Sequence, residues 1–149
     1  MAVLTIDYTV ALPPFDTSFV NELHALAEQV FGRVKRDNLE WRLSNMPCPS
    51  VHTARASGLV GFKLGYALKP RLYYSWLGGV DEEHRRQGIA LRLTQDQHDW
   101  ARGNGYREIE TGLVSSNIAM LSLNLKVGFQ VTGTCTRTSG PRIIMSKQL

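Results

Sequence analysis

The order of strand-like and helix-like segments in the middle of the chain constrains the fold most strongly. Three strand-like runs, at 51–56, 60–66 and 72–80, are separated only by short turns, and turns this short join antiparallel neighbours. The apolar pattern then becomes helical from 88 to 102 and returns to that of a strand at 108–114. Because a strand, helix, strand order requires a crossover, the strands at 72–80 and 108–114 should be parallel. The sequence therefore predicts one sheet that contains both kinds of pairing.

The segments on either side extend this pattern. A strand is predicted from Leu4 to Val10, helices from Asp16 to Gly32 and from Asp37 to Met46, a helix from Asn117 to Lys126, and strands from Phe129 to Thr136 and from Arg142 to Lys147. We therefore expect an α+β (α/β) fold around a mixed central sheet, with two helices before the antiparallel strands and two after them. A chain of 149 residues has the size of one domain, so we expect a single domain over residues 1–149.

Composition excludes several classes of protein. Hydrophobic residues make up 43% of the chain and charged residues 20%, which is typical of a globular protein and not of a disordered or coiled-coil one. The two cysteines cannot form a disulfide framework, no apolar run reaches the roughly 18 residues of a membrane span, and the first residues lack the order of a signal peptide. We therefore expect a cytoplasmic protein with no membrane partner. The net charge of +4 is dispersed along the chain, so we do not expect nucleic acid as a partner.

The segment from Val80 to Ala90 carries the strongest chemical signal. It joins a predicted strand to a predicted helix, and the start of a helix has unsatisfied N–H groups and a partial positive charge. Gly88 lets the backbone approach a ligand closely, and Arg85 and Arg86 add two cationic side chains. The segment has the features of a phosphate-binding turn, although it contains neither a P-loop nor a dinucleotide-binding glycine motif. A polar turn with a glycine at the helix start explains the same residues without a ligand.

Two motifs in this chain resemble the GNAT family of N-acetyltransferases. The run Arg85-Arg86-Gln87-Gly88-Ile89-Ala90 matches the R/Q-x-x-G-x-G/A signature of that family. The segment from Asn117 to Phe129 resembles the family's helix that runs from an asparagine to a Gly-Phe pair. The predicted order of strands and helices covers nearly the whole chain and agrees with the family's fold. The resemblance implies an N-acetyltransferase that moves an acetyl group from acetyl-CoA to a primary amine of a small molecule or peptide, by direct attack in a ternary complex.

The resemblance also implies a binding site for acyl-CoA. In such a site, backbone N–H groups near the start of the helix hold the pyrophosphate, and the end of the strand at 72–80 holds the pantetheine arm. The implied contacts are Gly78, Gly79, Val80, Arg85, Arg86, Gln87, Gly88, Ile89, Ala90, Leu91 and Asn117. Glycines weaken a strand, so Gly78 and Gly79 either let the pantetheine approach or mark a β-bulge, and the two interpretations are compatible. Asn117 either hydrogen-bonds near the pantetheine arm or caps the following helix.

Transfer to an amine needs a neutral amine and a protonated leaving thiolate. Many relatives carry a tyrosine as the acid four residues before the Gly-Phe glycine, where this chain has Asn124. An asparagine can hydrogen-bond the sulfur or the carbonyl oxygen but cannot give up a proton. The thiolate would then be protonated by Tyr73, by Tyr74 or by water, or the chain binds acyl-CoA with little turnover. Glu110 is the candidate base because it shares strand parity with Gly112, where some relatives place a carboxylate.

Other features leave alternatives open. His52 is a second, weaker candidate for the base, and without a strong base the acceptor should be an amine of low pKa such as an α-amine. Loss of the acidic tyrosine would also suit an acyl-CoA-binding sensor or regulatory module. The spacing of the histidines and cysteines suggests no metal site. The resemblance implies acetyl-CoA as the acyl donor and a homodimer through the last two strands.

Overall fold

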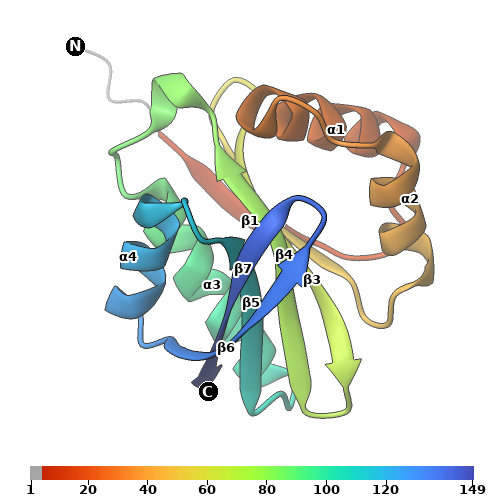
Figure 1. Cartoon of the computed structure of the whole chain (residues 1–149). Helices are drawn as coiled ribbons and strands as arrows, with labels where there is room; N and C mark the ends of the chain where they lie inside the picture. The colour runs from red at the N-terminus through yellow and green to blue at the C-terminus, as the bar shows by residue number, and fades with distance from the viewer. Residues whose placement is uncertain (1–4) are drawn as a thin grey trace.

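The computed structural model describes residues 5–149, which form one seven-stranded sheet with helices on both faces (Figure 1). The elements are β1 (Asp7–Ala11), α1 (Thr17–Phe31), α2 (Arg36–Asn45), β2 (Ser50–Arg55), β3 (Leu59–Lys69), β4 (Leu72–Val80), the 3-10 turn η1 (Glu82–His84), α3 (Ile89–Gly103), β5 (Glu108–Val114), α4 (Ile118–Lys126), β6 (Gln130–Arg137) and β7 (Gly140–Gln148). The strands follow the order β1-β2-β3-β4-β5-β7-β6, in which β4 and β5 are parallel and the other neighbours are antiparallel. The predicted mixed sheet and element order are confirmed. Leu4 of the predicted first strand lies outside the described residues.

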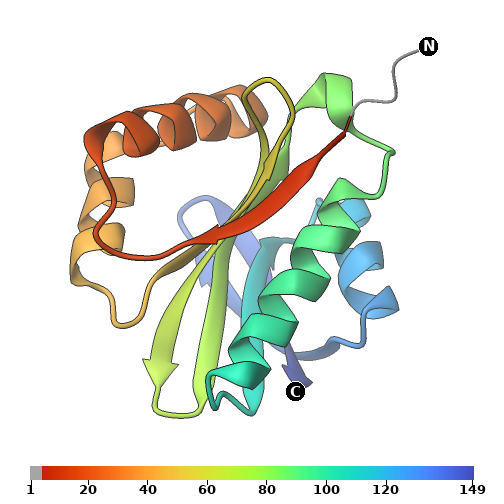
Figure 2. The ribbon, with the colours of Figure 1, turned by 180° about the vertical axis from the view of Figure 1, so that it is seen from behind.

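The helices cover the two faces of the sheet in pairs, as the front and rear views show (Figures 1 and 2). α1 and α2 lie on one face, where Leu23 and Leu39 pack with Phe62 of β3. α3 and α4 lie on the other face, where Leu93 of α3 packs with Ala54 of β2. Burying a leucine or phenylalanine side chain of this kind contributes about 1.5–3 kcal/mol. The central strands are therefore buried on both faces, and a polar side chain on them has no route to bulk solvent across the sheet.

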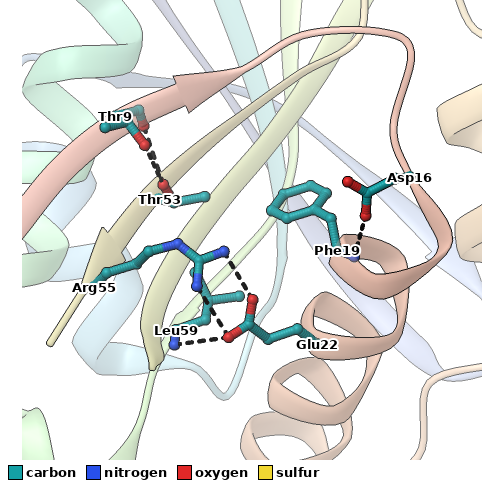
Figure 3. A network of polar contacts seen from close by, with 7 residues as sticks. All are labelled: Thr9, Asp16, Phe19, Glu22, Thr53, Arg55 and Leu59. Carbon is teal, nitrogen blue, oxygen red and sulfur yellow. Dashed lines mark hydrogen bonds and ion pairs between the residues drawn. The ribbon is translucent and has the colours of Figure 1, made fainter. Parts of the chain in front are cut away.

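Polar contacts cap the start of helix α1 and join its second turn to the sheet (Figure 3). The carboxylate of Asp16 accepts a hydrogen bond from the Phe19 N–H at 2.7 Å and caps the start of the helix. One turn later, Glu22 forms an ion pair with Arg55 at 2.7 Å and accepts a hydrogen bond from the Leu59 N–H at 3.2 Å (Figure 3). The hydrogen bond from Arg55 lowers the pKa of Glu22. Because the pair is partly exposed, it adds at most about 1 kcal/mol, and its main effect is to orient α1 against the turn between β2 and β3.

Strand β4 contains a β-bulge. Its pairing with β3 slips by one residue between Leu64 and Gly65, which leaves Trp76 without a partner on β3. One interpretation of the Gly78-Gly79 pair placed a bulge at these glycines. The structure corrects this position, because Gly78 and Gly79 both pair regularly with β3 and the extra residue is Trp76. A bulge bends its strand and increases the local twist, so β4 changes direction just before the two glycines.

The change of direction separates β4 from β5. Parallel pairing of the two strands stops at Ser75 and Thr111, and the Thr111 hydroxyl donates to the Ser75 carbonyl oxygen at 2.9 Å at that point. Beyond it, no backbone pairing joins the two strands within residues 5–149. Residues 76–80 therefore present a free strand edge toward the diverging β5.

Two further findings bear on partners. None of the helices within residues 5–149 combines the length and the apolar character needed to cross a membrane.

Strand β6 lies at the edge of the sheet and leaves Val131 54% exposed. A homodimer through β6 and β7 stays a prediction.

Candidate functional site

A cavity of about 560 Å³ opens beside the free edge of β4. It is enclosed by the end of β4, the turn that follows it, the first turns of α3 and α4, and the end of α1. Ten of the eleven residues expected to contact acyl-CoA line this cavity, namely Gly78, Gly79, Val80, Arg85, Arg86, Gly88, Ile89, Ala90, Leu91 and Asn117. Gln87 does not line it. The fold thus brings both sequence motifs, which are separated by the whole of α3 and β5, to one cavity.

The start of α3 has the chemistry of an anion site. Gly88 adopts φ 79° and ψ 8°, a left-handed conformation that favours glycine, and in the described chain no side chain caps the helix that follows. The first N–H groups of α3 therefore remain available to an anion. The Nε of Arg85 donates to the Val80 carbonyl oxygen at 3.0 Å, which ties the turn to the end of β4. With Arg86 also on the cavity wall, these groups fit a pyrophosphate.

The two glycines of β4 have different neighbours. A Cβ on Gly79 would stand 2.7 Å from Val30 of α1, so this glycine is needed for α1 to pack closely on the strand. A Cβ on Gly78 would stand 3.2 Å from the Phe62 carbonyl oxygen and 3.3 Å from Cγ of Lys63. The sequence suggested room for a ligand or a β-bulge at these positions. The structure adds a packing reason at Gly79, and leaves the free edge of residues 76–80 to pair with an extended ligand.

Asn117 caps the start of α4. Its side-chain oxygen accepts a hydrogen bond from the Met120 N–H at 3.2 Å, as expected of an N-cap asparagine. Asn117 also lines the cavity. The capping role is therefore present in the structure, and a contact with the pantetheine arm stays a prediction.

Tyr74 and Glu110 form a pair on the sheet face that α1 and α2 cover. They are directly opposite each other in the parallel β4–β5 ladder, one residue before the strands separate. The Tyr74 hydroxyl lies 3.2 Å from the point where a Cβ of Gly112 would stand, so it extends over the diverging part of β5. Burial raises the pKa of Tyr74, and its hydroxyl keeps its proton at neutral pH and can donate a hydrogen bond. Neither residue lines the cavity, and both flank the point where it begins.

Two other candidates are buried in the core, Tyr73 against α3 and Asn124 between α4 and β7. The Tyr73 hydroxyl is within hydrogen-bond distance of Ser50 Oγ at 2.6 Å, and its ring packs against Trp100. Asn124 is 2% exposed, with its Nδ2 3.8 Å from the Met145 sulfur, and it does not line the cavity. A contact between Asn124 and a thioester stays a prediction, which in this arrangement would require its amide to turn away from Met145.

Comparison with known proteins identifies the family. The model of the acetyltransferase (GNAT) family matches residues 17–129 of the chain. The chain belongs to this family. A segment of 54 residues is 39% identical to human N-acetyltransferase 8 and covers 36% of this chain and 24% of that protein. The chain therefore spans about a quarter of the length of that curated relative where the two match.

Solved GNAT structures share the whole fold. A GNAT family acetyltransferase from Elizabethkingia anophelis with acetyl-CoA bound is 16% identical, with a TM-score of 0.80 over 97% of this chain and 98% of that one. The ribosomal-protein-S18-alanine N-acetyltransferase from Escherichia coli is 15% identical, with a TM-score of 0.79 over 95% of this chain and 94% of that one. At sequence identities of 15% and 16%, the similarity between this chain and these two proteins is a similarity of fold.

Lys63 is a charged cavity residue of this GNAT chain that the sequence alone did not point to. It lies on β3 opposite Gly78, is 9% exposed and lines the cavity, and burial lowers its pKa to about 8. In the sequence it alternates with Phe62 and Leu64, a pattern typical of a lysine on a solvent-facing side of a strand. The feature that could have identified Lys63 is the central position of β3 in the sheet, where helices cover both faces of the strand. A lysine on such a strand must face a cavity or a partner.

A layer of buried polar groups continues from Lys63 beneath α3. His52 of β2 and His98 of α3 each have an unpaired buried Nε2, and both amide atoms of Gln97 are unpaired, within the part of the chain that the structure describes. Burial lowers the pKa of His52 to about 4 and that of His98 to about 3. Both rings are therefore neutral at pH 7, and His52 is too enclosed to reach an acceptor amine as the base.

Proposed function

We propose that this GNAT acetyltransferase transfers an acetyl group from acetyl-CoA to a primary amine of a small molecule or peptide. The observation that carries the proposal is the cavity that joins an uncapped helix start to the free edge of β4. The helix start supplies N–H donors, a partial positive charge and two arginines for the pyrophosphate. The strand edge supplies backbone groups for the amides of the pantetheine arm. This order of groups leads the thioester toward the point where β4 and β5 separate.

We assign the acceptor amine to the opposite side of that point, where Tyr74 and Glu110 face α1 and α2. Glu110 takes a proton from the amine, directly or through water, and Tyr74 donates a hydrogen bond to the reacting group. Tyr74 and Glu110 directly precede Ser75 and Thr111, the last pair between β4 and β5. They are therefore close to the gap between the two strands, through which the acceptor amine must reach the thioester. An α-amine is neutral far more often than a lysine amine at pH 7, a difference of about 3 kcal/mol, so α-amines are the preferred acceptors.

The proposal is tested by measuring thermal stability with acetyl-CoA and with CoA, followed by thiol release with a panel of amines. A ligand at a hundredfold excess over its dissociation constant stabilises the folded chain by about 3 kcal/mol. We expect this stabilisation with both ligands and thiol release with at least one α-amine. An unchanged melting temperature with both ligands would contradict the proposal.

A second candidate function, an acyl-CoA sensor without turnover, is favoured by the burial of Asn124 where many relatives carry the acidic tyrosine. The same samples separate the two functions. Stabilisation by acetyl-CoA without thiol release over the whole panel would support the sensor, and stabilisation with release would support the transferase.

Glu110→Gln is expected to lower kcat for the best α-amine by about a hundredfold, the effect typical of a lost general base. Affinity for acetyl-CoA should not change, because Glu110 does not line the cavity. Glu108→Gln is the matched control, since Glu108 lies two residues earlier on the same face of β5, away from the gap. Equal rates for the two variants would remove Glu110 from the mechanism.

A further inference from the structure

Lys63 differs from every other charged residue of the cavity wall that the structure describes, because it is buried. It is 9% exposed, whereas Arg85 and Arg86 are exposed and His84 is intermediate. Its side chain leaves β3 opposite Gly78, with its Cγ 3.3 Å from the point where a Cβ at 78 would stand. Glycine at this position therefore lets the lysine cross β4 to reach the cavity.

No carboxylate neutralises the Lys63 ammonium. Within residues 5–149 it takes part in no ion pair, and burial alone accounts for its lowered pKa. The titratable groups that face it are His52 from β2 and His98 from α3, and Lys147 from β7 lies 3.1 Å beyond the His98 ring. The one carboxylate that acts on His52, that of Asp96, is already paired on the outer side of α3. The surroundings of Lys63 therefore add no negative charge.

The cavity wall has two chemically different parts. Arg85, Arg86 and the first N–H groups of α3 follow the end of β4, whereas Lys63 lies opposite Gly78, two residues before that end, and Thr94 lies further along α3. Thr94 is five residues into α3, about 7.5 Å along the helix from Ile89 at 1.5 Å per residue. A ligand with its pyrophosphate at the helix start and its pantetheine arm along β4 carries its sulfur inward, toward Lys63.

We propose that the Lys63 ammonium is the charge partner of the CoA sulfur and stabilises it as a thiolate. The inference rests on the proposed function, because it requires CoA in this cavity. When the acceptor nitrogen bonds to the acetyl carbon and the carbon–sulfur bond breaks, the electron pair stays on the sulfur beside the ammonium, which keeps its proton. The thiolate later takes its proton from Tyr74 or from water.

The surroundings of Lys63 suit this role. A cation in a site of low dielectric interacts more strongly with a nearby thiolate than it would in water. With a pKa of about 8, Lys63 remains largely protonated at neutral pH. A buried ammonium without a partner also lowers the stability of the unliganded chain, and such a cost is typical of groups retained for function.

The test is binding of CoA and of S-methyl-CoA at pH 8, by calorimetry, to the intact chain and to Lys63→Met. Because S-methyl-CoA cannot ionise, it lacks the thiolate that the ammonium would pair with. A charge-assisted pair predicts that the intact chain binds CoA about tenfold more tightly than S-methyl-CoA. Lys63→Met should remove this preference, leave affinity for S-methyl-CoA within about twofold, and raise the melting temperature of the unliganded protein.

Three controls sharpen the result. Lys69→Met removes an exposed lysine of the same strand and should keep the preference, and Lys63→Arg should restore part of it. Equal binding of both ligands to the intact chain would overturn the role of Lys63 alone, whereas failure of both to bind would overturn the proposed function. Acetylation of Lys63 after incubation with acetyl-CoA, detected by mass spectrometry, would also overturn the inference, because the amine would then be an acceptor.

Discussion

At pH 5 the chain is expected to be about 4 kcal/mol less stable to unfolding than at pH 7.5, because His52 and His98 must remain neutral in the folded state. Their folded pKa values of about 4 and about 3 lie below the value of about 6.5 for an unfolded histidine. The unfolded chain therefore binds more protons between pH 6.5 and pH 4. The stabilisation is fully present above pH 6.5 and is lost as the pH falls, by about 2 kcal/mol for each ring at pH 5.

Urea unfolding at the two pH values measures this effect. The double variant His52→Gln, His98→Gln should show a much smaller difference between them, since it lacks both rings. His24→Gln is the matched control, because His24 lies on α1 with its ring partly exposed and hydrogen-bonded to the Val34 carbonyl. A stability of the unaltered chain that stays constant from pH 7.5 to pH 5 would mean that the rings carry protons in the folded protein.

Gly88→Ala is expected to weaken CoA binding about a thousandfold, through loss of two or more charge-assisted hydrogen bonds from the helix start. No atom of the described chain lies within 4 Å of where its Cβ would stand, so the new methyl group would enter the space that a pyrophosphate needs. The left-handed conformation of Gly88 adds a backbone cost of about 1–2 kcal/mol in the folded state. The variant should therefore fold with reduced stability and bind CoA far more weakly than the unaltered chain.

Gly105→Ala separates these two effects. Gly105 has a similar φ of 89°, equally open surroundings and a position outside the cavity. It should lose as much stability as Gly88→Ala while keeping its affinity for CoA, measured by calorimetry. Equal affinities for the two variants would show that the start of α3 does not hold the ligand.

The mixed topology was predictable because it depends on local signals. The lengths of the turns between residues 51 and 80 require antiparallel neighbours, and the helix before Glu108 requires a crossover. The place of most Arg85 to Ala90 residues on the cavity wall was predictable for the same reason, since this motif is contiguous and sits at a strand-to-helix turn. One turn can position all of these groups without help from distant parts of the chain.

The rest of the site depends on contacts between distant segments of the chain. The alternation of apolar and polar residues along one strand does not show these contacts. Successive residues such as Tyr73 and Tyr74 must face opposite ways, but which face carries the chemistry depends on the helices packed there. The position of the bulge depends on the register between β4 and β3. The interpretation based on the glycine pair placed the bulge at Gly78 and Gly79, which begin two residues after its actual position at Trp76. Lys63 looked solvent-facing because the second helical layer over β3 comes from α3, far away in sequence.

The bulge at Trp76 also constrains how the protein can change over evolutionary time. Before it, Tyr74 and Trp76 pack on the face of α1 and α2, while after it Gly78 and Val80 point to the face of α3. In the proposed function, one series of alternate positions thus serves both substrates, and the extra residue separates the donor surface from the acceptor surface. Point substitutions can alter acceptor choice and leave the donor surface as it is. Deleting a single residue at this point would remove the bulge and straighten β4 where it now turns from β5, so relatives that diverge in acceptor should keep the length of β4 constant.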